Sequence, residues 1–325
     1  MKVSRMIAAL VVALPVAALA GTVVPTVYEQ GHFFAAPTLA SGKTLKLNVD
    51  TGGGSGFWFL TTSAAAPLHL APVHCDGGGS FAATPAFAPG KGLPPMKPRV
   101  CDAISVNPDC PGGDMDDGSL SAWFLAQGTW TFDYPARRLT LEDKGWEPAS
   151  EAHGVSLGFV ENPHGDFGTP YPRITIKVAG EPVDFLLDTG ATAHPTREGR
   201  KAMGTGVAAN GFAAGSYITT SVMNLWHDHH PDWQVVDNAD DLFGAGKATR
   251  AIRVPSVDIA GWAVGPVWFT ERRDSAFGED GMSGMMDSEV HGSVGGNLFA
   301  HFRLVMDYPR RKAWFTCIEG CKAAK

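Results

Sequence analysis

The chain is poor in charged residues. Only 18% of its 325 residues are Asp, Glu, Lys or Arg, whereas about a quarter is usual in a globular protein. The first twenty residues hold two of the 26 basic residues and none of the 33 acidic ones, so the remainder has a net charge of −9. With so few basic residues, we expect no nucleic acid and no anionic membrane surface as partner.

Long apolar runs are also scarce. After residue 20, no stretch reaches the 18 uninterrupted apolar residues that suggest a membrane-spanning helix. Residues 1–20 combine Lys2 and Arg5 with an apolar stretch and a small-residue site that ends at Ala20. This pattern predicts a signal peptide, and hence an exported protein, periplasmic or secreted, with no membrane association after cleavage. The alternative is an uncleaved helix that retains the protein at the membrane.

Cysteines are few, and none of their spacings is that of a zinc site. The five are Cys75, Cys101, Cys110, Cys317 and Cys321. In an exported protein they are expected to form disulfides. We expect Cys317 to pair with Cys321, and two of the other three to pair in a combination that the sequence leaves open. We predict no cofactor and no bound metal.

Glycine and proline, in contrast, are abundant. With 39 glycines and 23 prolines, the sequence is divided into short alternating runs, which predicts a mostly β protein. The expected strands are residues 44–49, 57–60, 129–132, 138–141, 174–178, 184–187, 252–259, 267–270, 303–307 and 312–316, and the expected helices are residues 121–127, 196–203 and 295–301.

The tripeptide Asp-Thr-Gly occurs twice, each time directly after an apolar alternating run. The first copy begins at Asp50 and the second at Asp188. A single copy would indicate no more than a strand followed by a turn, because Asp, Thr and Gly all suit turns. Two strands that end in this way can bring two carboxylates face to face, where they share a proton and act together as acid and base.

Each tripeptide is followed by a second matching block. A Gly-Ser element begins at Gly118 and again at Gly292, and an Asp-Tyr-Pro sequence begins at Asp133 and again at Asp307. Positions 118 and 292 are 174 apart, and so are positions 133 and 307, so the two blocks align without a gap. The chain is therefore an internal duplication.

Residues 174–192, which contain the second Asp-Thr-Gly, resemble the catalytic strand of retropepsin-like aspartic proteases. Residues 293–299 resemble the apolar-apolar-Gly element that supports the catalytic loop in that family. Two such lobes in one chain resemble the pepsin-like arrangement. The resemblance implies a mostly β, bilobal aspartic protease fold, with two retropepsin-like β-barrel lobes and the cleft between them. We expect residues 21–148 to form the N-terminal lobe with Asp50, and residues 149–325 the C-terminal lobe with Asp188.

The same resemblance implies an aspartic endopeptidase, in which a water activated between Asp50 and Asp188 attacks the peptide bond. The residues expected to support the two catalytic loops are Thr51, Gly52, Thr189 and Gly190. The expected substrate is a peptide or protein, and the expected assembly is a monomer whose two lobes act as an internal pseudo-dimer. The alternative is a catalytically inactive protein that binds peptides on the same scaffold.

Two departures from the family pattern affect the site. No tyrosine lies between Asp50 and Gly118, where the first lobe of a pepsin carries one in its flap. Tyr217 of the second half is the candidate that could cover the cleft and bind substrate. Each Asp-Thr-Gly is followed by Gly53 or Ala191 rather than by Ser or Thr. Without a hydroxyl to stabilise an ionised aspartate, the pKa of the pair should rise and the pH optimum should lie in mild acid.

Two irregular segments complete the sequence pattern. Residues 76–118 would hold the flap, and their Asp114, Asp116 and Asp117 favour a solvated loop, with a calcium site as the alternative. The extra length of the second half is expected within residues 220–250, as a surface loop. Its histidine cluster, His227 to His230, leaves a zinc site and a metal-dependent protein as a further alternative.

Overall fold

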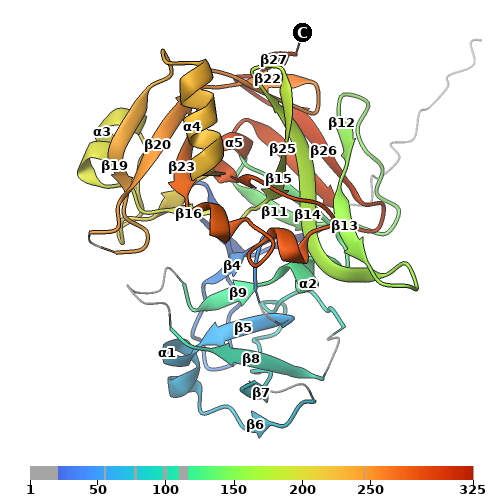
Figure 1. The fold of residues 1–325 in the computed structure, drawn as a ribbon. Coiled ribbons are helices and arrows are strands. Elements are labelled where there is room, and N and C mark those ends of the chain that lie inside the picture. Colours follow the sequence, from blue (N-terminus) through green and yellow to red (C-terminus); the bar gives the residue numbers. More distant parts are fainter. Residues whose placement is uncertain are drawn as a thin grey trace, which may run out of the picture.

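A computed structural model describes residues 21–54, 56–76, 79–97, 101–109, 116–244 and 246–324. The expected signal peptide, Cys110 and Asp114 lie outside the described residues. The chain forms two lobes made mostly of β-strands, with the first half below the second in Figure 1. The predicted mostly β, bilobal architecture is confirmed.

The lobe of the first half is built on an eight-stranded sheet. Its strands lie in the order β2 (Thr26–Glu29), β3 (His32–Ala35), β4 (Leu47–Val49), β9 (Gly118–Leu120), β5 (Trp58–Thr61), β8 (Ala103–Asn107), β7 (Phe81–Ala83) and β6 (Pro72–Val73). β4 lies inside the sheet, antiparallel to β3 and parallel to β9. Asp50, which follows β4 directly, is therefore positioned by strands on both sides.

The segment expected to hold the flap, residues 76–118, contains β7 and β8 in its described part. β7 and β8 pair with each other, and β8 pairs with β5, so these strands extend the sheet away from β4. The carboxylates of Asp116 and Asp117 accept hydrogen bonds from the backbone N–H groups of Gly118, at 3.1 Å, and Lys46, at 2.8 Å. Among the described residues no group of three or more His, Cys, Asp or Glu side chains is arranged to hold a metal ion.

The lobe of the second half is built on an eleven-stranded sheet. Its strands lie in the order β19 (Val235–Asp240), β20 (Thr249–Val254), β23 (Val267–Arg272), β18 (Tyr217–Thr219), β24 (Gly292–Val294), β15 (Glu181–Leu187), β14 (Phe167–Val178), β21 (Val257–Ile259), β22 (Trp262–Val264) and β27 (Lys322–Ala323), and β13 (Gly158–Glu161) pairs with β14. A separate ribbon joins β16 (Thr192–Ala193) to β17 (Ala213–Ala214). β15 precedes Asp188 and pairs with β14 and β24, as β4 does with β3 and β9.

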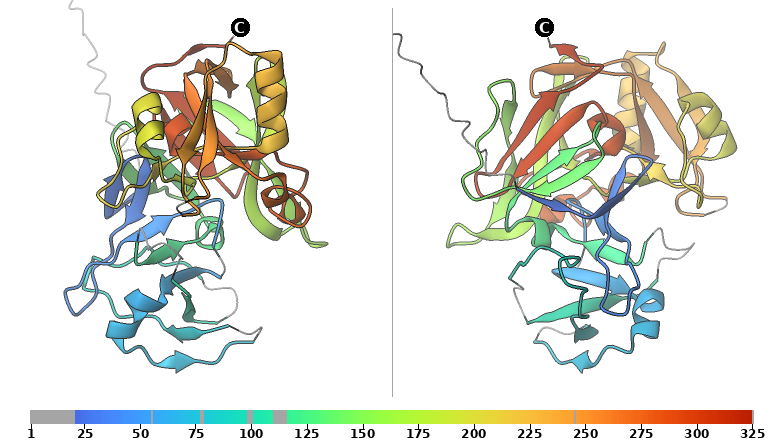
Figure 2. Two further views of the ribbon diagram at one scale, coloured as in Figure 1. Left: turned by 60° about the vertical axis from the view of Figure 1, so that its left-hand side comes forward. Right: turned by 180° about the vertical axis from the view of Figure 1, so that it is seen from behind.

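A six-stranded sheet combines strands of both halves. The order is β1 (Thr22–Val24), β11 (Arg138–Leu141), β10 (Thr129–Asp133), β25 (Phe302–Asp307), β26 (Lys312–Cys317) and β12 (His153–Ser156). β10 and β25 are the duplicated strands, and they pair antiparallel at the centre (Figure 2). Their aromatic side chains are fully buried, as Trp130 and Phe132 show. This shared sheet joins the two lobes through continuous backbone hydrogen bonds.

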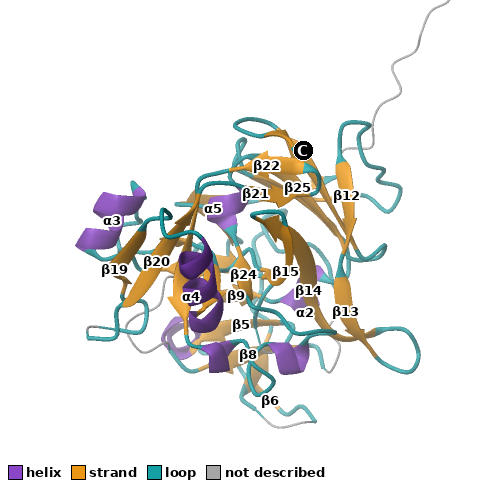
Figure 3. Ribbon diagram, turned by 45° about the horizontal axis from the view of Figure 1, so that its top comes forward, coloured by secondary structure: helices purple, strands orange, loops and turns teal. Residues whose placement is uncertain are grey.

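Helices are short and few (Figure 3). They are α1 (Thr62–Ala65), α2 (Ala122–Leu125), α3 (Arg197–Met203), α4 (Thr220–His229) and α5 (Gly296–Phe299), with 3-10 turns η1 (Ala66–Leu68), η2 (Asp274–Ala276) and η3 (Ser283–Met285). α2 and α5 follow the two Gly-Ser elements, as predicted. α3 starts where the Thr196 hydroxyl accepts a bond from Gly199 N and ends at Gly204, whose φ is +64°. Among the described residues no helix is long and apolar enough to cross a membrane.

The surface loop expected within residues 220–250 is the clearest error in the sequence prediction. The segment instead forms α4 and most of the β19–β20 hairpin. Met223 and Trp226 lie on one face of α4 and are buried, and Trp233 is buried beside Trp226. Met223 and Trp226 are three positions apart, which is the spacing of an amphipathic helix, and this spacing could have predicted α4. A smaller error is the strand expected at residues 252–259, which is divided between β20 and β21 at Pro255.

Two disulfides are formed among the described cysteines. Cys75 pairs with Cys101 in the first lobe, and Cys317, the last residue of β26, pairs with Cys321. The predicted Cys317–Cys321 bridge is therefore confirmed. The Cys75–Cys101 bridge shows which two of the three cysteines in the first half are paired, a choice that the sequence left open. These two cysteines are 26 positions apart, and β7 lies between them.

Candidate active site

The two Asp-Thr-Gly loops occupy equivalent places, and the duplicated Gly-Ser blocks hold both. The backbone N–H of Asp50 donates to Leu120 O at 3.1 Å, and that of Asp188 donates to Val294 O at 2.9 Å. Leu120 and Val294 end β9 and β24, the parallel partners of the strands that precede Asp50 and Asp188. In each half, the Gly-Ser block therefore fixes the position of the aspartate at the end of the neighbouring strand.

The structure brings Asp50 and Asp188 together, with a glycine of each loop packed against the other carboxyl group. A methyl group placed on Gly52 would lie 2.4 Å from Asp188 Cγ, and one on Gly190 would lie 2.5 Å from Asp50 Cγ. Each glycine also donates its N–H to its own aspartate, Gly52 to Asp50 Oδ1 at 2.8 Å and Gly190 to Asp188 Oδ1 at 3.0 Å. Only glycine can fill either position without displacing a carboxylate.

Thr51 and Thr189 form a reciprocal set of hydrogen bonds beneath the carboxylates. The Thr51 hydroxyl donates to Leu187 O at 2.7 Å and accepts from Thr189 N at 2.9 Å. The Thr189 hydroxyl donates to Val49 O at 2.6 Å and accepts from Thr51 N at 3.1 Å. Both threonines are buried. Each hydroxyl thus links its loop to the backbone of the opposite lobe, which holds the two loops in register.

The paired carboxyl groups favour retention of a proton. Burial is the main cause that raises the pKa of Asp50 above its usual value, and the N–H groups of Gly52 and Gly53 oppose the rise. Burial also raises the pKa of Asp188 well above its usual value, and the nearby charge of Asp50 raises it further. Two such groups titrate as a pair rather than as independent sites. The arrangement can therefore hold one proton between two carboxylates under mildly acidic conditions.

Two tyrosines of the duplicated Asp-Tyr-Pro blocks contribute to the environment of the pair. Tyr134 and Tyr308 are fully buried, and burial raises the pKa of both hydroxyls well above the usual range. The charge of Asp188 raises the pKa of Tyr134 further, and that of Asp50 does the same for Tyr308. Both tyrosines therefore stay neutral and provide apolar rings close to the carboxylates.

Lobe one differs from lobe two in the residue that begins the supporting helix. Ser121 stands where Gly295 stands in the second lobe. Its hydroxyl donates to Gly56 O at 2.6 Å and Phe57 O at 2.8 Å, and it accepts from Trp123 N at 3.2 Å. A methyl group on Gly54 would lie 2.4 Å from Ser121 Cβ. The absence of a side chain at Gly54 thus leaves the space that the Ser121 side chain occupies.

Tyr217 lies behind the second catalytic loop. Its hydroxyl donates to Thr192 O and accepts from Thr192 N, and its ring is 4.0 Å from the guanidinium carbon of Arg272. The ring is partly buried in a small apolar cluster that includes Leu186 and Met286. In this position Tyr217 holds Thr192 in place, and its role in substrate binding stays a prediction.

A buried ion pair supports the same loop. Arg272 Nη2 lies 2.9 Å from Asp240 Oδ2, and both side chains are almost wholly buried. The other oxygen of Asp240 accepts from the backbone N–H groups of His194, at 2.8 Å, and Leu242, at 3.2 Å. Through these contacts the pair connects the sheet of lobe two to the segment just after the second Asp-Thr-Gly.

Removing the carboxylate of Asp240 is expected to destabilise the fold strongly. In Asp240→Asn the Arg272 guanidinium stays buried without its counter-charge, and such losses cost about 3–5 kcal/mol of unfolding free energy. Denaturant unfolding of the variant and the wild type measures the difference. Glu147→Gln, which breaks an exposed pair with Arg310, is the matched control and should change the stability little. Equal stability of Asp240→Asn and the wild type would contradict the structural role of the pair.

The sequence prediction missed two residues near the catalytic loops. The Tyr171 hydroxyl, on β14, donates to Gly54 O at 3.3 Å; burial raises the pKa of that hydroxyl, and the charge of Asp50 raises it further. His32, on β3, contacts Ala191 and Thr192 of the second loop. No local motif marks either residue, because both act through strand pairing between distant parts of the chain.

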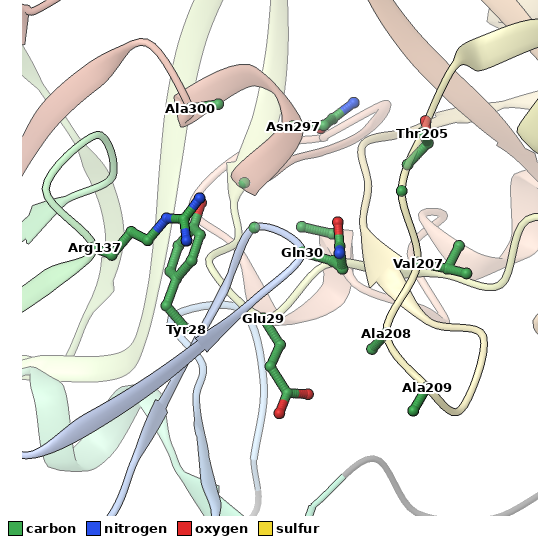
Figure 4. A pocket seen from close by; sticks show the side chains of 14 residues that line it. Tyr28, Glu29, Gln30, Arg137, Thr205, Val207, Ala208, Ala209, Asn297 and Ala300 are labelled. Carbon is green, nitrogen blue, oxygen red and sulfur yellow. The ribbon is translucent and has the colours of Figure 1, made fainter.

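A cavity of about 610 Å³ lies where the lobes meet, apart from the two aspartates. The β2–β3 turn, residues 205–209 and α5 line it, and Arg137 stands beside the Tyr28 ring at one side (Figure 4). Gly31 and Gly296 form part of its wall, where a methyl group on Gly296 would lie 2.2 Å from Gly31 O. The lobes are therefore in close backbone contact beside this cavity.

Comparison with known proteins gives a likeness of architecture. No protein-family model and no curated protein matches the chain. One similar solved structure is the aspartic proteinase from Irpex lacteus, with 12% identical residues and a TM-score of 0.44. The match covers 93% of this chain and 98% of that chain. The functional interpretation therefore depends on the site itself.

Proposed function

We propose that the protein is an aspartic endopeptidase that hydrolyses peptide bonds with a water activated between Asp50 and Asp188. The observation that carries the proposal is the meeting of two carboxyl groups from equivalent loops. Burial and mutual repulsion favour a shared proton between them. The bonds of Thr51 and Thr189 hold the two loops in register, as catalysis by positioned groups requires.

The chemistry needs no covalent intermediate. The ionised carboxylate takes a proton from the water, whose oxygen attacks the scissile carbonyl carbon, while the protonated carboxyl gives its proton to the carbonyl oxygen. The resulting tetrahedral diol then collapses. One carboxyl protonates the leaving nitrogen as the C–N bond breaks, and the other recovers a proton from a diol hydroxyl. The pair ends with the single proton with which it began.

The working pH follows from this shared proton. The pair is inactive when both carboxyls are protonated and also when both are ionised, so the optimum lies between its two pKa values. Burial moves the pKa of both groups upward. Neither Gly53 nor Ala191 has a side-chain hydroxyl that would lower them. We therefore propose an optimum in mild rather than strong acid.

The proposed substrate is an extended segment of peptide or protein. Main-chain hydrogen bonds would supply affinity, and pockets for alternate side chains would supply preference. The proposed location is outside the cytoplasm, periplasmic or secreted, because the Cys75–Cys101 and Cys317–Cys321 disulfides suit an oxidising compartment. We propose a monomer, with the two lobes together forming one site.

The test is cleavage of denatured casein from about pH 2 to about pH 8, with and without pepstatin and with and without a metal chelator. We expect cleavage with a maximum in mild acid, inhibition by pepstatin and full activity in the chelator. A maximum near pH 2 would contradict the proposed pKa values of the pair. Loss of activity in the chelator would instead favour the metal-dependent alternative.

The second candidate is a protein that binds peptides on this scaffold without cutting them. The glycine-rich first loop favours it, since Gly52, Gly53 and Gly54 give the Asp50 turn unusual conformational freedom. Folded and correctly processed wild type that binds peptide but shows no turnover at any pH would support this candidate over the enzyme.

A further inference from the structure

His32 and Tyr171 occupy equivalent positions in the two lobes. In lobe one Phe34 pairs with Asn48, and in lobe two Arg173 pairs with Leu186. Asn48 and Leu186 each stand two residues before a catalytic aspartate. His32 and Tyr171 each stand two residues before the paired residue, on the same face of the neighbouring strand. Strand register therefore places one ring beside each catalytic strand.

His32 reaches from lobe one to the catalytic loop of lobe two. Its Nε2 atom lies 3.1 Å from Ala191 O and 3.1 Å from Thr192 Oγ1, and the side chain is 2% exposed. The Thr192 hydroxyl in turn donates to Gly190 O at 2.8 Å. A neutral imidazole with its proton on Nε2 donates to the Ala191 carbonyl. Lobe one thereby holds the segment that immediately follows Asp188.

Tyr171 makes the reverse connection from lobe two to the catalytic loop of lobe one. Its hydroxyl donates to Gly54 O at 3.3 Å, and Gly54 follows Asp50 by four residues. This contact is longer than those of His32, and the Tyr171 side chain is only partly buried. The two connections are thus equivalent in topology but unequal in strength.

We propose that His32 and Tyr171 are positioning residues, each of which holds the catalytic loop of the opposite lobe, with His32 as the stronger of the two. This inference rests on the proposed endopeptidase function. Each side chain acts by fixing the distance between the two carboxylates, on which catalysis by a positioned pair depends steeply.

Both loops are held from both lobes. Within lobe two, Tyr217 bonds both backbone atoms of Thr192, and His32 adds the support from lobe one. The first loop is held by Tyr171 from β14 and, within lobe one, by the backbone N–H of Ala122, which donates to Gly53 O at 3.2 Å.

Kinetics of three variants test the proposal. His32→Phe keeps a ring but loses both contacts, and its kcat should fall about 100-fold with KM little changed, since misplacement by about 1 Å costs that much. His32→Gln can still donate to Ala191 O, so its kcat should recover to within about tenfold of the wild type. Tyr171→Phe loses one long hydrogen bond and should lower kcat by severalfold. The matched controls are His164→Gln, at an exposed histidine, and Tyr28→Phe, at a tyrosine on the same hairpin as His32.

Hydrogen exchange provides a readout that does not need catalysis. His32→Phe, in lobe one, should speed amide exchange in residues 186–196 of lobe two, and His32→Gln should restore most of the protection. If the wild type proves inactive, the proposed function fails while this measurement still tests the contact between lobes. Unchanged exchange, or a wild-type kcat for His32→Phe, would overturn the role of His32. Wild-type kcat for Tyr171→Phe would overturn the role of Tyr171.

The pH dependence of stability gives a third readout. Burial lowers the pKa of His32 from 6.5 to about 4, with Lys46 lowering it further and Glu29 and two backbone carbonyls opposing the shift. The unfolded chain therefore binds a proton at His32 more readily than the folded one. As pH falls from 6.5 to about 4, this residue alone should make folding less favourable. His32→Gln should weaken that pH dependence, and an unchanged profile would argue against a buried neutral His32.

Discussion

Asparagine at either catalytic position is expected to abolish turnover while making the protein more stable at neutral pH. Asp188→Asn and Asp50→Asn each remove a carboxyl group that must both give and take a proton. General acid–base catalysis of this kind contributes about 10²–10⁴-fold to the rate, so activity should fall by at least that factor. The measurement is kcat/KM for cleavage of denatured casein near the pH optimum.

The gain in stability follows from the sign of the pKa shifts. Both aspartates have a pKa raised in the folded state, so the folded chain binds more protons than the unfolded chain above their ordinary pKa. The free energy of unfolding therefore decreases as pH rises through the range of the folded pKa values. A neutral amide in the same place avoids this loss. Thermal unfolding should show a higher Tm for Asp188→Asn than for the wild type near pH 7, with a smaller difference near pH 4.

The matched control for this pair of effects is Asp166→Asn, which removes an exposed carboxylate in the turn between β13 and β14. It should leave both activity and the pH dependence of Tm close to those of the wild type. An Asp188→Asn variant that keeps substantial activity would exclude the proposed mechanism. One that is inactive but less stable at neutral pH would contradict the raised pKa of Asp188 in the folded state.

Alanine at Gly52 or Gly190 is expected to remove nearly as much activity as loss of a carboxylate. The added methyl group would lie 2.4 Å from Asp188 Cγ in the first variant and 2.5 Å from Asp50 Cγ in the second. Real carbon atoms do not approach so closely, so the opposing carboxyl group must move. A displacement of about 1 Å at a catalytic group costs about 100-fold in rate, and we expect at least that loss in kcat.

Gly145→Ala is the control for the glycine variants, because a methyl group there meets no atom within 4 Å. Both it and the wild type should cleave denatured casein at the same rate. Thermal unfolding shows whether Gly52→Ala and Gly190→Ala are still folded, so that loss of activity can be attributed to the site. Wild-type kcat in either variant would mean that the two loops are farther apart in solution than the packing of Gly52 and Gly190 requires.

The sequence predicted the parts of the fold that depend on local patterns or on the duplication. The strands before Asp50 and Asp188 have alternating apolar residues, and the Gly-Ser blocks repeat without a gap, so their equivalence follows from the sequence alone. The expectation that Thr51 and Thr189 support the two loops came from the family resemblance. Each of these predictions needs only residues close to a recognisable motif.

The remainder depends on pairings that no local pattern specifies. His32 reaches Ala191 across 159 positions and Tyr171 reaches Gly54 across 117, so neither could be assigned before the register of β3 and β14 was known. The segment 220–250 was misjudged because its histidines and aspartates suggested a solvated loop. The burial of Met223 and Trp226 against the sheet outweighs that polar character.

The central sheet also affects how the chain can fold. β10 pairs with β25 across about 170 residues, since Asp133 is aligned with Arg303. Contacts at such separation form slowly, because a long loop must close before they stabilise anything. A nascent chain that has not yet reached β25 exposes one edge of β10 as an unpaired strand, which is a site for aggregation. The central sheet of such a chain can therefore be completed only after β25 has been synthesised.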